Sequence, residues 1–592
     1  MSTRLKPVDA VIIGYGWTGS IMAKTLTDAG LSVVALERGP ARDTAPDFEY
    51  PRIADELKYG IRGYLSHPLA KETVTVRHKP ADTAVPYRQY GSFVLGHGVG
   101  GAGVHWNGQL WRASPEDLRL HSHIQERYGK KFIPPDMSIQ DYPVTFEELE
   151  PHFDHFEKVC GVSGTAGNLR GQLQPGGNPF EGPRSDAYPT PPLPPVASAD
   201  LFAKAARELG HKPFPLPAAN SSCAYTNPYG VRMGPCNLCG FCERFGCFLY
   251  SKASPQTCIL PVLAGRPNLE VRTDSYVTRI LLDKEGRRAT GVSYIDPNGR
   301  EVEQPADLVI VCAFQMHSVR LLLLSGIGKP YDPHTGQGVV GKNYSYQICS
   351  LTTAFFDQSV QINPFIAAGA AGQQAVDDFN SDHFDHGKAG FIGGSVLSAS
   401  GTGGRPIEQL VLPPEAPRWG QGWKEAAQKH YRHTAVYLSQ GSVMSYPDSY
   451  LDLDPTYKDV NGQPLLRMTF NWHDNEYRMA AFSGARMTEI VRAMNPQSYS
   501  QVLIKSGDLY DTRIYQSTHT AGGAIIGSNP SNSVINRYSQ TWDVHNVFVM
   551  GASAFPQNIG YNPTGLVAGL AYFAAAKIRD TYLKSPGPLV SA

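Results

Sequence analysis

The chain has 592 residues with 53 basic and 53 acidic side chains, and 41% of its residues are hydrophobic. This length predicts two or more domains, and the ordinary apolar fraction is typical of a globular enzyme. The formal net charge of zero provides no basic excess for binding nucleic acid and no acidic excess typical of a disordered tail.

No transmembrane segment and no export signal are expected in this chain. No apolar run reaches the roughly 18 residues that cross a bilayer. The best candidate, residues 563–577, ends in a lysine and is expected to form a buried helix. Residues 1–7 are short and polar, so an exported protein would need its signal on another polypeptide.

A nucleotide-binding pattern opens the chain. Residues 8–13 predict a buried parallel strand that runs directly into the sequence GYGWTG at residues 14–19. A helix is predicted at residues 20–29 and a second strand at residues 32–36. This order of strand, glycine loop, helix and strand predicts a Rossmann-like unit, and its N-terminal position in a long chain favours FAD over NAD.

Five residues of this unit are predicted to bind the cofactor. Gly14 permits the tight turn, Gly16 lets the backbone approach a pyrophosphate, and Gly19 allows helix and strand to pack closely. Glu37, which ends the second strand, is placed to accept hydrogen bonds from ribose hydroxyl groups, and Arg38 follows it. The alternative is a glycine loop that binds no ligand.

Three later segments resemble the glucose–methanol–choline (GMC) oxidoreductase family. They are residues 96–108, residues 306–328 and residues 549–556, in the order that the family has. The resemblance implies an α/β fold in which a Rossmann-like FAD-binding domain is interleaved with an α+β substrate domain, built from an antiparallel sheet and helices. It also implies cofactor contacts at Gly100, Gly101, His105, Asn107, Val277, Gly551, Ala552, Asn562, Pro563 and Thr564.

The reaction of that family is hydride transfer from an alcohol carbon to the flavin, assisted by two polar residues. The resemblance assigns these roles to His519, within residues 515–523, and to Asn562. A neutral imidazole can accept the alcohol proton, and an amide can hold the substrate oxygen. The alternatives are a core histidine and a helix N-cap ahead of Pro563. Residues 522–524 read Gly-Gly-Ala where the family often has Gly-Thr, which weakens the alignment of neighbouring contacts.

His105 is also a candidate for covalent attachment of the flavin. The pair His105-Trp106 resembles pyranose oxidase-like members of the family, in which the histidine is bonded to the flavin. A covalent bond and a non-covalent contact are both open at this residue.

A second redox centre is predicted from four clustered cysteines. Cys236, Cys239, Cys242 and Cys247 have the spacing C-x2-C-x2-C-x4-C. Several thiolates in one tight loop suit an iron–sulfur cluster. The alternatives are a zinc site, which usually has two pairs separated by a longer spacer, and disulfides, which would close strained loops at this spacing. A cluster beside a flavin gives electrons an exit one at a time, so we expect a dehydrogenase rather than an oxygen-using oxidase.

The GMC frame together with the cysteine loop resembles the family of flavoprotein subunits of membrane-bound gluconate 2-dehydrogenases. This resemblance implies oxidation of a sugar acid, D-gluconate to 2-keto-D-gluconate, and a cluster of the 3Fe-4S type. It also implies a small subunit that carries the export signal and a multihaem cytochrome c subunit, at the periplasmic face of the inner membrane. The alternatives are a related dehydrogenase acting on 2-ketogluconate, sorbitol or fructose, and an electron-transfer subunit without catalysis.

The domains are expected to be interleaved along the chain. The FAD-binding domain is predicted at residues 1–45, 91–120, 199–345 and 500–592, a flexible flavin lid at 46–90, an iron–sulfur loop at 223–258 and the substrate domain at 345–500. The Pro- and Gly-rich residues 165–197 predict an irregular surface excursion. Further predictions are a helix that Ser198 caps and Gly210 ends, a helix at 474–494, hairpin turns at 298–299 and 461–462, and a solvated loop at 382–387.

Overall fold

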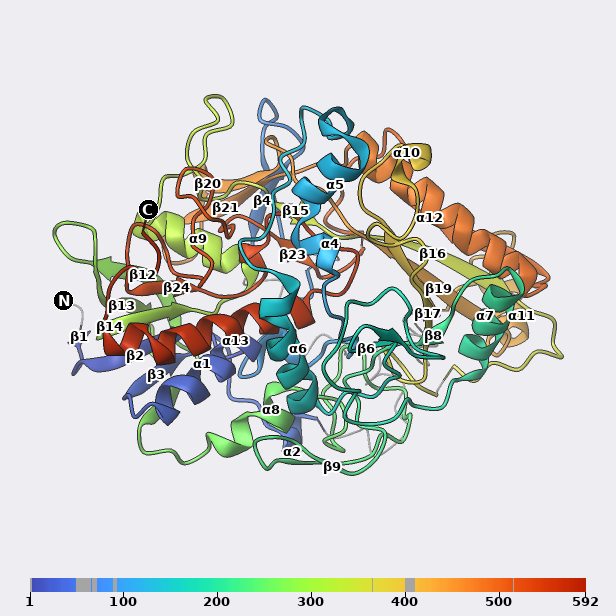
Figure 1. Cartoon of the computed structure of the whole chain (residues 1–592), viewed down its shortest axis with the longest axis horizontal. Coiled ribbons are helices and arrows are strands. Elements are labelled where there is room, and N and C mark those ends of the chain that lie inside the picture. The colour runs from blue at the N-terminus through green and yellow to red at the C-terminus, as the bar shows by residue number, and fades with distance from the viewer. Residues whose placement is uncertain are drawn as a thin grey trace.

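A computed structural model of the chain describes residues 3–48, 65–66, 72–88, 93–364, 366–399, 410–514 and 516–591. Two large sheets lie toward opposite ends of the long axis (Figure 1). The eight-stranded sheet lies near both termini, and the six-stranded sheet lies beside α12 (Asp474–Ala493). Irregular loops from the middle of the chain lie between them (Figure 1).

The eight-stranded sheet has the parallel core that the nucleotide-binding pattern predicts. It consists of β1 (Thr3–Arg4), β2 (Val8–Ile13), β3 (Val33–Leu36), β11 (Leu269–Arg272), β12 (Tyr276–Leu282), β13 (Ala289–Ile295), β14 (Glu301–Val311) and β24 (Val547–Val549). The order is β11-β3-β2-β14-β13-β12, and β1 and β24 also pair with β14. The pairings within β11-β3-β2-β14 and those of β1 and β24 with β14 are parallel, whereas β13 is antiparallel to both of its neighbours, β12 and β14.

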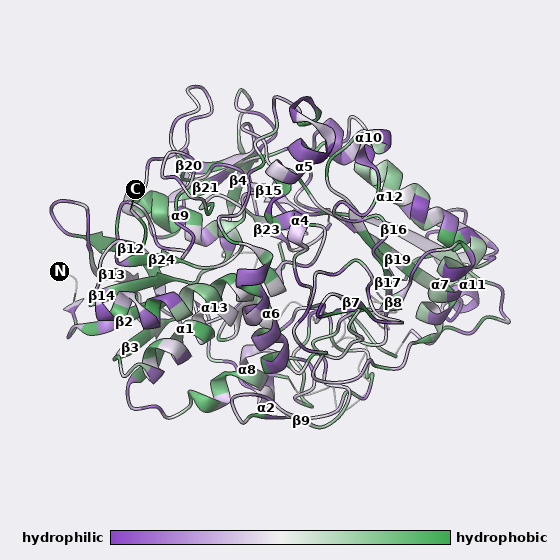
Figure 2. Cartoon of the chain, in the orientation of Figure 1, coloured by the Kyte–Doolittle hydropathy of each residue, from purple (hydrophilic) through white to green (hydrophobic). Residues whose placement is uncertain are grey.

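Helices cover this sheet and bury its apolar strands. The neighbours α1 (Trp17–Asp28) and α13 (Thr564–Asp580) lie side by side along it, and α9 (Gln315–Ser325) packs against β12 (Figure 1). The buried parts of these strands are apolar, because a strand covered on both faces contacts other elements on each. Residues 10–13 of β2, all of β3 and residues 308–311 of β14 are hydrophobic and buried, and green strands run through this sheet in Figure 2. The predicted buried helix before the C-terminus is confirmed as α13.

The first helix differs from the prediction in where it begins. α1 starts at Trp17 with Gly16 as its N-cap, whereas the sequence predicted a start at residue 20. Gly19 therefore lies inside the helix, where a Cβ would come 2.1 Å from the carbonyl oxygen of Gly14. The close packing of helix and strand thus requires glycine at this position.

The six-stranded sheet is antiparallel and carries helices on one face. Its strands, in order, are β22 (Ser498–Val502), β16 (Ile348–Phe355), β19 (Thr434–Gly441), β18 (Ser395–Ser398), β17 (Gln374–Val376) and β8 (Phe214–Pro215). α12 packs against β16, β18 and β19, and α7 (Ala197–Glu208) packs against α12 and β17. The predicted helix at 474–494 is confirmed. The predicted N-cap at Ser198 is wrong, because α7 begins at Ala197 and its N-cap is Val196.

A third sheet brings an early segment of the chain beside a late one. It has the order β20 (Tyr450–Lys458), β21 (Pro464–Thr469), β4 (Val74–Arg77) and β5 (Val85–Tyr87). β4 and β5 belong to the predicted lid at 46–90, so residues 74–87 of that segment are part of a sheet. Residues 49–64, 67–71 and 89–92 lie outside the described residues, and the lid stays a prediction. The hairpin turns at 298–299 and 461–462 are confirmed.

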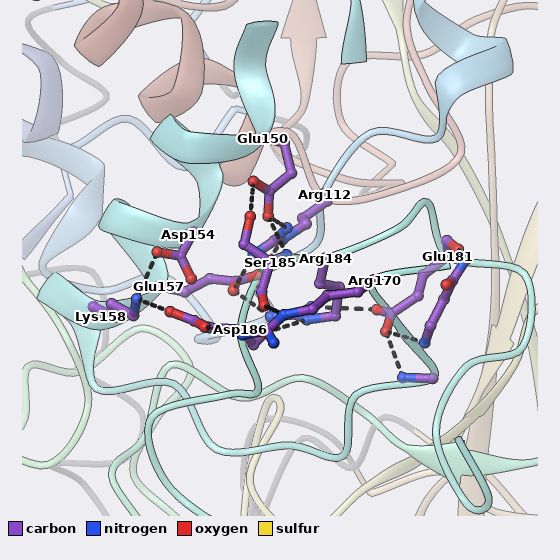
Figure 3. Close-up of polar contacts among 12 residues, drawn as sticks. Arg112, Glu150, Asp154, Glu157, Lys158, Arg170, Glu181, Arg184, Ser185 and Asp186 are labelled. Atoms are coloured by element: carbon purple, nitrogen blue, oxygen red, sulfur yellow. Dashed lines mark hydrogen bonds and ion pairs between the residues drawn. The ribbon is translucent and has the colours of Figure 1, made fainter. Parts of the chain in front are cut away.

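The predicted irregular excursion at 165–197 is anchored by buried charges. α6 (Phe146–Cys160) presents Glu150 and Glu157 to Arg112, at 2.8 Å and 2.7 Å, and Arg184 of the excursion bonds Glu157 from the other side (Figure 3). Only 1% of the Glu157 side chain and none of the Arg184 side chain is exposed. Ion pairs therefore hold this segment in place, because most of it is not paired in helices or strands.

The prediction of a solvated loop at residues 382–387 is wrong. Asp382 is buried and accepts hydrogen bonds from His123, Arg127 and Tyr128 of α5 (Leu120–Tyr128). His386 is 1% exposed. The Asp382 carboxylate holds this loop inside the protein, because its hydrogen-bond partners lie some 250 residues earlier in the chain. The local composition of the loop does not reveal partners so distant in sequence.

The other elements are short, except α11, and mostly join the larger ones. They are α2 (Thr44–Asp47), η3 (Gly101–Gly103), α4 (Pro115–Leu118), η4 (Lys130–Phe132), β6 (Asn168–Leu169), β7 (Gln172–Leu173), β9 (Tyr225–Thr226), β10 (Arg232–Met233), α8 (Pro255–Cys258), η5 (Leu260–Val262), β15 (Ser345–Tyr346), α10 (His386–Ala389), α11 (Gly420–His430), β23 (Thr520–Ala521), η6 (Ala552–Ala554) and η7 (Tyr582–Lys584), where η marks a 3-10 helix. Within the described ranges, no helix has both the length and the apolar character needed to cross a bilayer.

Candidate active site

A cavity of about 740 Å³ extends from the eight-stranded sheet to the six-stranded sheet. Its walls include the end of β2, the start of α13 and one side of β16, β19 and β22. This volume lies in the upper part of the range of roughly 300–1,000 Å³ that ligand pockets have.

Most of the residues predicted to bind cofactor or substrate line this cavity. They are Gly14, Gly16, Glu37, Arg38, Gly101, His105, Asn107, Val277, His519, Gly551, Ala552, Asn562, Pro563 and Thr564. The cavity thus brings together segments separated by more than 500 residues. Two predicted residues do not line it. Gly19 packs α1 against β2, and Gly100 faces the side chains of Gln256 and Val104.

The end of the cavity beside β2 is shaped to hold an anionic diphosphate. Gly14 has φ +93°, and a Cβ there would lie 2.6 Å from the carbonyl oxygen of Cys312. A Cβ at Gly16 would meet no protein atom nearer than 3.6 Å, so a ligand can approach the backbone there. No side chain caps the first turn of α1, so its N–H groups and positive dipole end are available to phosphate oxygens.

Glu37, at the end of β3, is held in place by backbone hydrogen bonds. Its carboxylate accepts hydrogen bonds from the backbone N–H groups of Tyr15, at 3.1 Å, and Gly39, at 2.9 Å. Burial raises the pKa of this carboxyl, and these N–H groups act in the opposite direction. Each oxygen keeps a second lone pair that could accept from a hydroxyl group.

His105 lines the cavity with one ring nitrogen engaged. Its Nε2 lies 3.0 Å from the carbonyl oxygen of Val94 and must carry the proton to bond it. Its buried Nδ1 has no hydrogen-bond partner among the described residues. Burial lowers the pKa of His105 to about 4, so the imidazole is neutral and Nδ1 offers a lone pair.

His519 and Asn562 face each other in the cavity. Asn562 Nδ2 lies 3.4 Å from His519 Nε2. His519 follows the buried Ser517, whose hydroxyl accepts from the His519 backbone N–H, and Asn562 directly precedes Pro563 and the start of α13. Two segments 43 residues apart in the chain therefore place a hydrogen-bond acceptor, His519 Nε2, beside a hydrogen-bond donor, Asn562 Nδ2.

Two glutamines that the sequence did not reveal fix how this pair is oriented. Gln347 donates from Nε2 to the carbonyl oxygens of Ile559 and Tyr561, so its Oε1 faces His519 Nδ1 and accepts from it. Gln440 donates to Asn562 Oδ1 at 3.0 Å. The proton of His519 is thereby placed on Nδ1, and Nε2 keeps its lone pair toward the cavity.

This arrangement can bind an alcohol and take its proton. A hydroxyl group between the two side chains could donate to His519 Nε2 while it accepts from Asn562 Nδ2. Burial lowers the pKa of His519 to about 3, so the imidazole is neutral at ordinary pH and ready to accept a proton. Transfer of that proton makes loss of hydride from the alcohol carbon easier.

The cysteine loop lies against the cavity without lining it through its thiols. Glu243 and Arg244 of this loop line the cavity, and the backbone N–H of Arg244 donates to the carbonyl oxygen of His105 at 2.7 Å. Cys242 is buried, and Cys236, Cys239 and Cys247 are half-buried. The loop is therefore adjacent to the segment that carries His105.

N–H donors approach three of the four sulfur atoms, those of Cys236, Cys242 and Cys247. The Asn220 side chain lies 3.4 Å from Cys242 Sγ, and the backbone N–H groups of Leu238 and Lys252 bond Cys236 Sγ and Cys247 Sγ, at 3.4 Å and 3.3 Å. Burial, together with the neighbouring thiols, raises the pKa of Cys236 to about 11. All nine cysteines are thiols rather than disulfides.

The described residues hold no group of three or more His, Cys, Asp or Glu side chains placed to bind one metal ion. A single tetrahedral zinc ion draws its sulfurs close, because each lies about 2.3 Å from the metal. An iron–sulfur cluster spreads its thiolates over several irons, so its sulfurs lie farther apart. The four cysteines predicted to bind metal therefore do not form such a group in the described structure, and the iron–sulfur cluster stays a prediction.

Comparisons with known proteins show the family of the chain. Residues 200–349 and 445–571 match two family models described as GMC oxidoreductase. The chain is 53% identical to the gluconate 2-dehydrogenase flavoprotein of Pantoea cypripedii over all of this chain and 97% of that protein. It is 25% identical to the fructose dehydrogenase large subunit of Gluconobacter japonicus, over 98% of this chain and 99% of that one. The structure of pyridoxine 4-oxidase from Mesorbium loti, 16% identical, has a TM-score of 0.57 over 96% of this chain and 98% of that one.

The chain belongs to the GMC oxidoreductase family and is an FAD-dependent oxidoreductase acting on CH–OH groups. The residues present fit FAD, because the uncapped start of α1, the open space at Gly16 and the unpartnered Nδ1 of His105 all belong to one cavity. FAD, when bound, supplies the acceptor for the hydride.

Proposed function

We propose that this protein is the flavin-bearing subunit of a dehydrogenase that oxidises a sugar acid, D-gluconate to 2-keto-D-gluconate. The observation that carries the substrate is the 53% identity, without large gaps in coverage, to a gluconate 2-dehydrogenase flavoprotein. The facing pair of His519 and Asn562 supports a catalytic subunit rather than an electron carrier, since a carrier needs no proton acceptor in its cavity.

A substrate screen tests this proposal. Purified protein loaded with FAD is given gluconate, 2-ketogluconate, sorbitol, fructose or glucose together with an artificial electron acceptor. Gluconate should give the highest kcat/KM. A higher kcat/KM for sorbitol or fructose would show instead that the substrate is a neutral polyol or sugar. This second candidate is favoured by one observation: of the three arginines that line the described cavity, two, Arg38 and Arg320, are already ion-paired, with Glu72 and Asp459.

The cysteine loop is proposed to hold an iron–sulfur cluster of the 3Fe-4S type, using three of Cys236, Cys239, Cys242 and Cys247. The donor set and its position beside the His105 segment support this assignment. Electrons would then leave the flavin one at a time toward a multihaem cytochrome c subunit. A small subunit would carry the export signal and place the complex at the periplasmic face of the inner membrane.

Iron and acid-labile sulfide should copurify with FAD in a constant ratio. The measurement is iron, zinc and sulfide per flavin in protein purified anaerobically. Replacing Cys242 by serine should lower iron and sulfide, whereas replacing the buried Cys160 of α6, which does not line the cavity, by serine should leave both unchanged. Zinc without iron in the wild-type protein would refute the cluster.

His105 is proposed to be bonded to the flavin through Nδ1. The neutral ring and its unpartnered nitrogen support this bond. Acid denaturation should therefore leave the yellow colour on the precipitated protein, and His105→Ala should release it into the supernatant. Colour found only in the supernatant of wild-type protein would exclude the bond.

A further inference from the structure

One wall of the cavity is formed by alternate residues of β16 and by the strand beside it. Cys349, Leu351 and Thr353 all line the cavity from β16, because residues two apart in a strand point to the same face. Gln440 lies opposite Cys349 on β19, and its side chain donates to Asn562. The pair of Cys349 and Gln440 therefore marks the part of this wall that lies beside Asn562.

Gln516 occupies the open edge of β16 next to this pair. β22 pairs with β16 only from Leu351 to Phe355, so the backbone N–H of Cys349 lies beyond the last pairing of β22. That N–H donates instead to Gln516 Oε1 at 3.1 Å, and Gln516 itself lines the cavity. The side-chain amide of Gln516 thus takes the place that a further residue of β22 would hold.

This hydrogen bond fixes which end of the Gln516 amide is free to meet a ligand. An N–H group can only donate, so the atom that faces the Cys349 N–H is the amide oxygen. The NH2 group of Gln516 points elsewhere and has no hydrogen-bond partner among the described residues. Two N–H donors are therefore available to a ligand in the cavity.

Gln516 and His519 are held by the same short stretch of chain. Gln347, two residues before Cys349, accepts from His519 Nδ1, and its backbone N–H donates to the His519 carbonyl oxygen at 3.1 Å. Two residues of extended chain span about 7 Å. One small substrate can therefore contact both side chains, with a hydrogen bond of about 2.8 Å at each end.

The charged side chains of the described cavity come from other segments. The end of β3, the cysteine loop and α9 supply them: Glu37, Arg38, Glu243, Arg244 and Arg320. Burial is the only cause of the lowered pKa of His519, as expected where no charged side chain is close. An anionic group bound next to His519 would therefore meet neutral N–H donors.

We propose that Gln516 is a specificity-determining residue that donates from Nε2 to the carboxylate of a 2-hydroxy acid substrate. This inference rests on the sugar-acid substrate proposed above. In such an acid the carboxylate is bonded directly to the carbon that loses the hydride, so it lies beside the hydroxyl group that His519 and Asn562 would bind. A carboxylate oxygen only accepts hydrogen bonds and the NH2 group of Gln516 only donates, so the two groups are complementary.

Gluconate and sorbitol are a matched pair of ligands for testing this contact, because they differ only in carrying a carboxylate or a CH2OH group at the first carbon. Gln516→Glu keeps an oxygen for the Cys349 N–H and replaces the two donors by an anionic oxygen. Gln516→Leu removes both functions. The matched control is Gln428→Leu, at an exposed position of α11.

The readouts are kcat and KM for gluconate, kcat/KM or the inhibition constant for sorbitol, and FAD per protein as a check of folding. Gln516→Glu should lower kcat/KM for gluconate by about 10- to 150-fold, mainly through a higher KM, because the contact with the charged carboxylate is lost. Sorbitol should be affected far less, since its hydroxyl group can donate to the new carboxylate. Gln516→Leu should also weaken gluconate, by a smaller factor, and Gln428→Leu should match wild type.

Two outcomes would contradict the inference, and they are distinguishable. A Gln516→Glu protein that keeps its FAD and the wild-type preference for gluconate over sorbitol would overturn the role of Gln516 alone. A wild-type protein with a higher kcat/KM for sorbitol would overturn the sugar-acid substrate and this contact together. If Gln516→Leu does not fold, Gln516→Glu decides the matter, because it retains the hydrogen bond to Cys349.

Discussion

Replacing His519 by alanine should slow substrate-driven bleaching of the flavin by about 10²- to 10⁴-fold. The variant should still bind FAD, because the contacts proposed for the nucleotide lie at β2 and α1, at the other end of the cavity. The loss follows from the neutral Nε2 that Gln347 orients toward the substrate position. The measurement is the rate of anaerobic loss of flavin absorbance after mixing with substrate.

Two further variants make this result specific. His334→Ala changes an exposed histidine outside the cavity and should leave the rate unchanged. Gln347→Leu keeps the imidazole but removes the acceptor that fixes its tautomer, so its rate should lie between those of wild type and His519→Ala. Bleaching by His519→Ala at a near-normal rate would remove this residue from the mechanism.

The nucleotide-binding half of the fold could be predicted from the sequence because its signals are local. The strand at 8–13, the glycine loop and the acid at Glu37 follow one another within 30 residues, and each has a direct mechanical reason. The start of α1 was missed because Trp17 and Thr18 are not typical of a helix start. Their place in the helix is decided by packing against the sheet, which a single sequence does not display.

The residues that orient His519 and Asn562, the proposed catalytic pair, could not be predicted from the sequence. Gln347 reaches His519 across 172 positions, and Gln440 reaches Asn562 across 122. Lys252 likewise cannot be distinguished from a surface lysine in the sequence, whereas the structure places three carbonyl oxygens around its Nζ. Positions of this kind depend on pairings between distant segments, whereas His519 and Asn562 themselves were marked by a family motif.

Glu157→Gln should reduce the free energy of unfolding by about 3–5 kcal/mol, because it leaves two buried arginines without their shared carboxylate. Glu157 accepts from Arg112 at 2.9 Å and 2.7 Å and also from Arg184 (Figure 3). Burial alone would raise the pKa of Glu157, but the two arginines outweigh it and lower the pKa. The carboxylate therefore stabilises the fold above the ordinary glutamate pKa, and this contribution is lost as the pH falls through the lowered one.

Unfolding by urea or heat, with FAD in excess, measures this effect at neutral and acidic pH. Glu147→Gln, on the exposed side of the same helix, should change stability by less than about 0.5 kcal/mol. Adding Arg184→Met to Glu157→Gln should cost less than the two single losses combined, by about 0.5–3 kcal/mol, because the second change removes a cation that the first left unpaired. Strictly additive losses, or a Glu157→Gln protein as stable as Glu147→Gln, would show that the excursion at 165–197 is held by something other than these charges. The difference in the free energy of unfolding between wild type and Glu157→Gln should also become smaller at acidic pH. Protonation then neutralises the Glu157 carboxylate in the wild-type protein as well.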